Sequence, residues 1–242
     1  MTSAKLLPSK PRIRLRARVA RAYNKPSPRD SNATRRRILA AALREFAAEG
    51  YSGARIDTIC KRARCNPRML YHHFGDKAGL YLAALDHVLG ELRGAELAQL
   101  EIDHGGPLEG IQKLFDFMHG HFGRHPELIS LLNGENLLRA RFLRRSIKTP
   151  LVASPLIQLI GQLLERGVKA RVFRRGIDPL QLYVTMAGLS YFPRSNAHTL
   201  SVIFRTDLLD PAWQAEQKRH AMQLLTRFLM RQPDAGNAAV TR

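Results

Sequence analysis

The segment 56–74 constrains the fold of this chain more than any other part, because it has the pattern of two short helices separated by a tight turn. Asn66 and Pro67 open the second helix, since asparagine caps a helix N-terminus well and proline suits the first helical position. Leu70 and Phe74, four residues apart, give this helix one edge to bury. A helix this short does not form alone in water. We therefore expect it to be held on a helical scaffold with its other face exposed.

The exposed face of the segment 66–73 carries groups that suit contact with DNA, namely Arg68, Met69, Tyr71, His72 and His73. In a helix-turn-helix the second helix lies in the major groove, where its first residues contact base edges. An arginine there can donate two hydrogen bonds to guanine O6 and N7. The pattern therefore predicts a DNA-reading helix. As alternatives, Tyr71 could pack in the core, His73 could join two helices by a hydrogen bond, and Arg68 could be a solvated charge.

Positive charge is concentrated at the N-terminus. The 242 residues contain 39 Lys and Arg against 20 Asp and Glu, and residues 1–37 alone hold twelve Lys or Arg with a single acid, Asp30. Residues 1–30 contain four prolines and few large apolar side chains, so we expect a disordered basic arm. Such arms contact phosphates or the minor groove beside a main DNA site. The alternatives are a solvated tail that adds only non-specific attraction, or an organelle transit peptide.

The rest of the chain has helical apolar spacing and no sustained strand alternation, which predicts an all-α fold. Gly50 is expected to end the first firm helix, and Asp76 to cap the fourth. No run approaches the ~20 apolar residues that a membrane span needs. The polar tail 232–242 is expected to be frayed. Helices are expected over 33–49, 55–63 and 66–73, from 76 into the nineties, and over 107–122, 126–145, 152–172, 178–194 and 211–230.

The segment 34–85 resembles the DNA-binding domain of TetR-type transcriptional regulators. The resemblance rests on Thr34-Arg35-Arg36-Arg37-Ile38-Leu39, on Gly50-Tyr51 and, most specifically, on Leu70-Tyr71-His72-His73-Phe74-Gly75-Asp76-Lys77. It implies a three-helix helix-turn-helix domain over 31–78. It further implies a C-terminal helical domain over 79–231 that binds a ligand and forms a dimer.

The resemblance also implies which residues contact DNA. Residues 67–69 match the base-reading positions, and most of the others match positions that contact phosphate. Arg64 fills a turn position where the family favours glycine, so a positive φ there would cost about 1 kcal/mol. The implied DNA-binding residues are Arg55, Pro67, Arg68, Met69, Tyr71, His72, His73 and Lys77.

For the C-terminal domain the resemblance implies a dimer face in the last helices and a small-molecule pocket between that face and the DNA domain. The dimer would set two recognition helices about 34–36 Å apart on a palindromic operator. The candidates for the dimer face are Tyr183, Met186, Leu189, Trp213, Leu225 and Phe228. The candidates for the pocket are Phe115, Met118, His119, Phe122, Asn133, Asn136 and Phe142, with Glu135 as a further polar group. All of these residues could instead belong to the plain core of the monomer.

The run Asn133-Gly134-Glu135-Asn136, followed by four arginines between 139 and 145, is similar to a subgroup that includes the regulator of pyrimidine use. The predicted function is a homodimeric repressor that an unknown small-molecule effector releases from double-stranded operator DNA. The alternative is a DNA-binding regulator that ignores small molecules and acts through partner contacts.

Other functions fit the sequence less well. His121 and His125 have a helical spacing that suggests a metal site, but no Glu follows His121 as in the His-Glu-x-x-His motif. Cys60 and Cys65 have no nearby partner ligands, so we interpret them as small buried hydrophobes in a reducing, cytoplasmic setting. We therefore predict no cofactor, no metal, no membrane partner and no enzyme activity.

Overall fold

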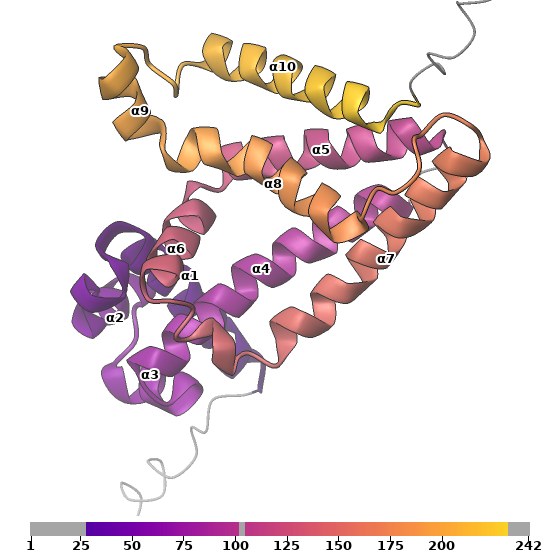
Figure 1. The fold of residues 1–242 in the computed structure, drawn as a ribbon. Helices are drawn as coiled ribbons and strands as arrows, with labels where there is room; N and C mark the ends of the chain where they lie inside the picture. The colour runs from indigo at the N-terminus through magenta and orange to yellow at the C-terminus, as the bar shows by residue number, and fades with distance from the viewer. Residues whose placement is uncertain (1–27, 102–104, 232–242) are drawn as a thin grey trace, which may run out of the picture.

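The computed structural model describes residues 28–101 and 105–231, and these ranges are helical with one isolated strand-like bridge between Phe173 and Met230 (Figure 1). The all-α prediction is therefore confirmed. The N-terminal helices are α1 (Pro28–Gly53), α2 (Ile56–Ala63), α3 (Pro67–Phe74) and α4 (Lys77–Glu101). The remaining elements are α5 (Pro107–Arg124), α6 (Pro126–Leu137), the 3₁₀ helix η1 (Leu143–Arg145), α7 (Lys148–Lys169), α8 (Pro179–Ser195), α9 (Ala197–Phe204) and α10 (Pro211–Leu229).

Helix α1 is longer than the sequence predicts. It begins at Pro28, because a proline at the first helical position has no N–H left without an acceptor, so residues 28–30 belong to the helix and not to the basic arm. At Gly50, where the sequence predicts the end of the helix, α1 has a kink with φ 64° and ψ −179° and then continues for one more turn. The remaining arm residues, 1–27, and the tail 232–242 lie outside the described residues.

The expected single helix over 126–145 is wrong, because α6 ends at Leu137. The chain then turns through two residues with positive φ, Arg139 at 54° and Ala140 at 57°. The cause is the buried carboxylate of Glu135, whose Oε1 accepts the backbone N–H of Phe142 at 2.7 Å and of Leu143 at 2.8 Å. A side chain therefore supplies the hydrogen bonds that a continued helix would have made.

Two further boundaries differ from the prediction. Helix α7 begins at Lys148, and Pro150 lies in its first turn. Backbone N–H groups of the first turn have no acceptor within the helix, so a proline there removes no helical hydrogen bond. Helix α9 was missed, because its apolar residues Val202, Ile203 and Phe204 are all exposed and give no amphipathic stripe. None of the described helices is long and apolar enough to cross a membrane.

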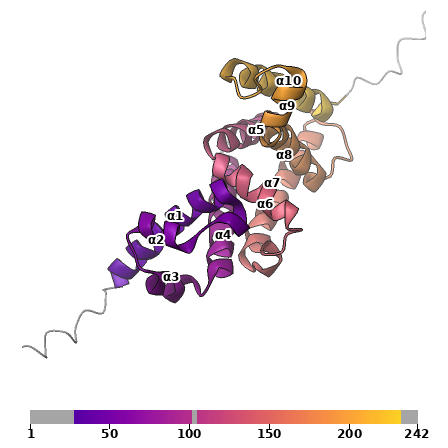
Figure 2. The same cartoon turned by 90° about the vertical axis from the view of Figure 1, so that its left-hand side faces the viewer.

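The core consists of two clusters of buried side chains. One lies among α1 to α4, the C-terminal end of α5, α6 and η1, and the other lies among the rest of α5, α7, α8 and α10. In the first cluster the rings of Phe46, Tyr51, Tyr81 and Phe142 pack against one another, with centroids 4.4 to 6.5 Å apart. The small helices α2 and α3 lie at one end of the molecule and α10 at the other (Figures 1 and 2). The first cluster thus fixes the position of α3.

Candidate nucleic-acid interface

Helix α3 is defined at both ends by local hydrogen bonds. The side chain of Asn66 accepts the backbone N–H of Met69 at 2.9 Å, as the capping pattern predicts. Gly75, with φ 78°, ends the helix and donates its N–H to the carbonyl of Tyr71 at 2.8 Å. Leu70 is fully buried and holds the helix on the first cluster. The opposite side of α3 therefore faces solvent in a fixed orientation.

The turn between α2 and α3 has the left-handed geometry that glycine favours. Arg64 has φ 51° and ψ 50°, and its N–H bonds to the carbonyl of Lys61 at 3.3 Å. Cys65 donates its N–H to the carbonyl of Cys60 at 3.0 Å. The position therefore does need a positive φ, and an L-residue there costs about 1 kcal/mol. The two helices nevertheless retain a closed, hydrogen-bonded turn.

The residues expected to contact DNA from α3 are mainly exposed. Pro67, Arg68 and His72 are exposed, and 46% of Tyr71 is accessible, so the alternative that Tyr71 packs in the core is excluded. Met69 and His73 are half-buried. Burial, followed by the neighbouring charges of His72 and Arg35, lowers the pKa of His73, which favours its neutral form. Three donors of hydrogen bonds thus share the accessible face of one short helix.

Arg55 and Lys77 flank that helix from other elements. Arg55 is the N-cap residue of α2, and its carbonyl accepts the N–H of Ile59 at 3.1 Å. Its own N–H donates to Glu45 Oε1 at 3.2 Å, while its side chain stays exposed. Lys77 Nζ donates to the carbonyl of Ser52 at 3.2 Å and lies 5.1 Å from the ring centroid of Tyr51. Lys77 therefore also ties the start of α4 to the end of α1.

Sequence reasoning missed the residues that join α1 to α2. Glu45 is buried on α1, and its Oε2 pairs with Arg62 at 3.0 Å. Arg37 Nε donates to the carbonyl of Ala63 at 3.3 Å. Arg37 and Arg44 lie two helical turns apart, and this spacing on one face of α1 was the available signal. With Arg62 and Arg64 they line a basic cavity of about 630 Å³.

The aromatic candidates for the effector pocket are divided between the two clusters. Phe115 and Met118 are fully buried in the cluster of α5, α7, α8 and α10. Phe122 and Phe142 belong to the other cluster, and the ring of Phe142 lies 4.4 Å from that of Tyr51. The structure therefore does not gather these four side chains around one space.

The polar candidates for the pocket have separate partners. His119, on α5, lies with Nε2 3.3 Å from Oε1 of Gln217 on α10. Asn133, on α6, accepts a hydrogen bond from the hydroxyl of Tyr191 on α8. Asn136 is exposed at the end of α6. Of these three candidates, His119 and Asn133 thus point toward neighbouring helices of the C-terminal domain.

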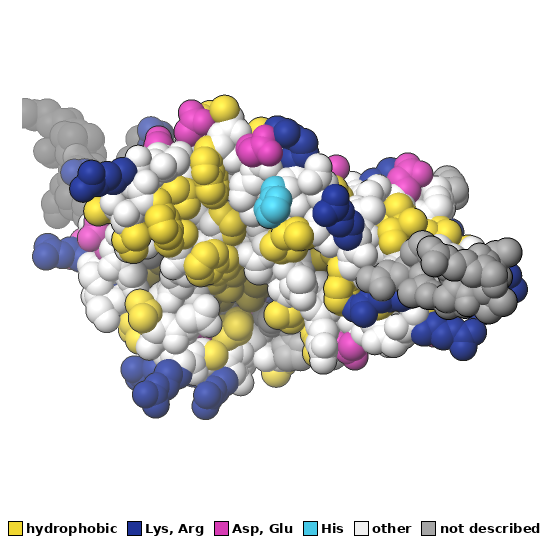
Figure 3. Space-filling view, turned by 45° about the horizontal axis from the view of Figure 1, so that its top comes forward, with side chains coloured by type: hydrophobic (Ala, Val, Ile, Leu, Met, Phe, Trp, Pro, Cys, Tyr) yellow, Lys and Arg dark blue, Asp and Glu magenta, His cyan; other side chains and the backbone are white. Residues whose placement is uncertain are grey.

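The candidates for the dimer face are also mixed. Met186 and Leu225 are buried in the core of the monomer, and the hydroxyl of Tyr183 donates to the buried Glu96 Oε1 at 3.3 Å. Leu189 and Trp213 are half-buried, and 46% of Phe228 is exposed. Apolar side chains gather on the side of the molecule that carries α9 and α10 (Figure 3). The exposed large apolar residues of α8 and α10 are Leu180, Val184, Phe192, Leu224 and Phe228.

The rival metal site does not have the ligands that it needs. The rings of His121 and His125 stack with centroids 4.2 Å apart, but within residues 28–101 and 105–231 no group of three or more His, Cys, Asp or Glu could hold a metal ion. Cys60 and Cys65 are free thiols, and burial raises the pKa of Cys60 to about 12. Cys60 is buried and Cys65 is only half-buried, and both pack against the first cluster as small apolar groups.

Comparisons with known proteins bear on both parts of the chain. The family described as bacterial regulatory proteins of the tetR family matches residues 38–84. The family described as the tetracyclin repressor-like C-terminal domain matches residues 107–225. The HTH-type transcriptional repressor NicS of Pseudomonas putida is 33% identical over 198 residues, which cover 82% of this chain and 93% of that protein.

A second relative and two solved structures agree with these matches. The HTH-type transcriptional repressor SCO4008 of Streptomyces coelicolor is 35% identical over 109 residues, which cover 45% of this chain and 53% of that protein. The fatty acid degradation regulator FadR of Bacillus halodurans has a TM-score of 0.61 at 18% identity, over 84% of this chain and 97% of that one. Reduced NemR of Escherichia coli has a TM-score of 0.59 at 19% identity, over 83% and 100%. At such identities the two structures support the fold alone.

Proposed function

This chain belongs to the TetR family of bacterial regulatory proteins, and we propose that it is a repressor that reads a palindromic operator with α3. The observation that carries the proposal is the accessible face of α3, which is fixed by the Asn66 cap and by buried Leu70. The recognition helix of a helix-turn-helix lies in the major groove, so it must be exposed along one side. Helix α3 is exposed in this way and is held from behind by the first cluster.

We assign the contacts with DNA by the chemistry of each side chain. Arg68, exposed in the first turn of α3, is the proposed base reader, because its guanidinium matches guanine O6 and N7. Tyr71, His72, Lys77 and Arg55 are the proposed phosphate contacts, with Pro67 and Met69 against thymine methyl groups and His73 beside them. Phosphate contacts set the register on DNA, and base contacts set the specificity.

The exposed apolar side chains of α8 and α10 support a homodimer. Leu180 and Val184 lie one helical turn apart on α8, as do Leu224 and Phe228 on α10, so each helix presents an apolar edge to solvent. A second copy of the chain would cover these edges and bring a second α3 to the same DNA. One short helix contacts only a few base pairs, so two copies are needed for a selective operator.

We also propose that a small molecule releases the protein from DNA by binding beside α8, in the region of α5, α8 and α10. Ser190 Oγ and Arg194 Nε, one turn apart on α8, are buried polar atoms without a hydrogen-bond partner in the described part of the chain. Unpaired buried polar groups cost free energy, which a polar ligand would recover. Such a ligand would act as an effector only if it bound more tightly to the dimer that fits DNA poorly. If no metabolite weakens operator binding, the alternative regulator that acts through partner contacts is favoured.

The test is a selection of genomic DNA fragments by the purified full-length protein, followed by affinity measurements on the recovered operator. Arg68→Ala should lower the preference for the operator over random DNA by a factor of about 5 to 150, equal to ~1–3 kcal/mol. Arg219→Ala, an exposed arginine of α10, is the matched control and should leave the preference unchanged. An unchanged preference in Arg68→Ala would remove Arg68 as a base reader.

The same proposal includes localisation and activity: we place the protein in the cytoplasm and assign it no catalytic activity. Turnover of a substrate by a purified protein that protects no DNA fragment would contradict the proposal. The names of the two curated relatives described above do not mention pyrimidine use, so the similarity of the run 133–136 to that subgroup stays a prediction.

A further inference from the structure

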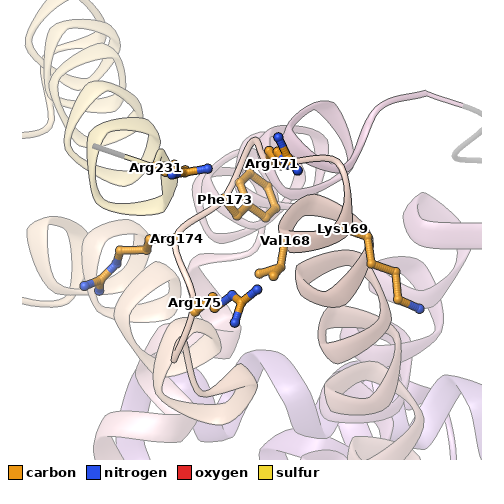
Figure 4. Close-up of a pocket in the computed structure, with 7 residues that line it drawn as sticks. All are labelled: Val168, Lys169, Arg171, Phe173, Arg174, Arg175 and Arg231. Atoms are coloured by element: carbon orange, nitrogen blue, oxygen red, sulfur yellow. The ribbon is translucent and has the colours of Figure 1, made fainter. Parts of the chain in front are cut away.

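A strongly basic cavity lies at the end of the molecule away from α3, in the region where α7, the loop 170–178 and the residues that follow α10 meet (Figures 1 and 4). Its volume is about 780 Å³, which lies within the range of small-molecule sites. Val168 and Phe173 supply apolar surface, and neither Asp nor Glu is among its lining residues. The positively charged residues that line it are Lys169, Arg171, Arg174, Arg175 and Arg231.

The backbone that carries these charges is held in place. Phe173 is 2% exposed, and its ring lies so close to Gly167 that a Cβ added there would be 1.9 Å from a ring carbon. Arg174 donates its N–H to the carbonyl of Leu229 at 2.9 Å, and Arg231 donates its N–H to the carbonyl of Val172 at 2.9 Å. The loop after α7 is therefore fixed to the end of α10 before any ligand binds.

Four charges of the cavity, those of Lys169, Arg171, Arg174 and Arg175, are poorly compensated by the described part of the protein. Lys169, Arg171 and Arg175 form no ion pair with any carboxylate of the described residues. The guanidinium of Arg174 lies 3.9 Å from the ring centroid of Phe228, which orders the side chain without neutralising it. Several like charges around one concave surface repel one another and focus a positive potential in it. A bound anion would remove that repulsion.

We propose that this cavity binds a small molecule with at least two anionic groups, either phosphates or carboxylates. Guanidinium groups donate paired hydrogen bonds to both kinds of group, and a single negative charge would leave most of the four cations Lys169, Arg171, Arg174 and Arg175 unbalanced. The cavity lies at the opposite end of the molecule from α3, so operator DNA held by α3 does not occupy it (Figures 1 and 2). This anion site is separate from the effector site that we propose beside Ser190 and Arg194 of α8.

The test uses calorimetric titration of the full-length protein with pyrophosphate and with citrate at constant ionic strength. The double variant Arg171→Gln/Arg175→Gln removes two charges from the cavity. The double variant Arg205→Gln/Arg219→Gln removes two exposed charges elsewhere, and Arg205, like Arg171, has a positive φ (52° and 58°). The two variants therefore match in net charge, and Arg171 and Arg205 also match in the sign of their backbone φ.

The expected result is one saturable site per chain, weakened at least tenfold in Arg171→Gln/Arg175→Gln and unchanged in the control. Saturation by pyrophosphate alone identifies phosphates as the ligand groups, and saturation by citrate alone identifies carboxylates. Operator affinity without either anion should be equal in both variants, so failure here is distinguishable from failure of the proposed DNA function. Absence of saturable binding, or equal weakening in the control, would overturn the proposal.

Discussion

Lowering the pH from 7.5 to 5.0 is expected to destabilise this fold, because α5 carries two buried histidines. Burial, with the nearby charge of Arg194 as the second cause, lowers the pKa of His119 to about 4. The hydrogen bond to Gln217 opposes this shift only in part. Burial and the neighbouring His125 lower the pKa of His121 to about 4 in the same way. Both rings are therefore neutral in the folded protein at pH 5.

The magnitude follows from the difference between folded and unfolded pKa values. In the unfolded chain a histidine titrates near 6.5, so between pH 6.5 and pH 4 the unfolded state binds more protons than the folded state. The contribution of the neutral histidines to the free energy of unfolding is therefore fully present above pH 6.5, and it is lost as the pH drops toward 4. At pH 5 each histidine lowers the free energy of unfolding by about 2 kcal/mol relative to pH 7.5, since one unit of pKa shift equals 1.36 kcal/mol.

Urea denaturation at the two pH values measures this effect in the wild type and in His119→Gln. Glutamine keeps an amide that can bond to Gln217 but does not titrate, so the loss of stability between pH 7.5 and 5.0 should shrink by about 2 kcal/mol. Carboxylates contribute equally to both proteins and cancel in the comparison. His198→Gln changes an exposed histidine and should leave the loss as it is in the wild type. The reasoning fails if His119→Gln retains the full loss.

Four other changes have defined outcomes. Deleting residues 1–27 removes eight Lys and Arg and no acid. The slope of log affinity for DNA against log salt concentration should flatten by about 0.9 for each phosphate that the arm neutralises. An equal slope in the deletion variant would mean that the arm touches no phosphate. Asn66→Ala should lower the free energy of unfolding by about 1 kcal/mol, because the N–H of Met69 loses its hydrogen-bond acceptor. Chemical denaturation measures this loss, and Asn66→Asp, which keeps an acceptor, is the control. Glu45→Gln should cost ~1–3 kcal/mol by the same assay, because a buried carboxylate that pairs with one arginine is replaced by a neutral amide. Gly167→Ala should cost ~1–3 kcal/mol, because its methyl group would overlap the ring of Phe173, and an unaltered unfolding midpoint would show that the loop can move aside.

The recognition helix could be predicted from the sequence because its determinants are local. Asn66 and Pro67 act on backbone groups within one turn of their own position, and the structure has both features. The positive φ of Arg64 was left open by the sequence, and the structure supplies it. Capping and turn chemistry depend on neighbours in the chain, so sequence patterns identify them.

The details of the C-terminal domain depend on contacts between distant residues and were harder to predict. The end of α6 is set by Glu135, whose carboxylate accepts hydrogen bonds from Phe142 and Leu143. Apolar spacing shows that Phe142 is buried, but it cannot show which cluster receives it. Spacing likewise cannot separate the core-facing Met186 from the exposed Val184 on the same helix. Candidate pocket and dimer residues therefore need the tertiary structure before they can be assigned.

The central claim is that α3 of two copies occupies successive major grooves, and methylation interference on the selected operator tests it most directly. Methylation of guanine N7 alters only the major groove, where Arg68 is proposed to bond. We predict that it blocks binding at two symmetric half-sites about 10 base pairs apart. Interference confined to adenine N3 in the minor groove, or none at any guanine, would contradict the claim.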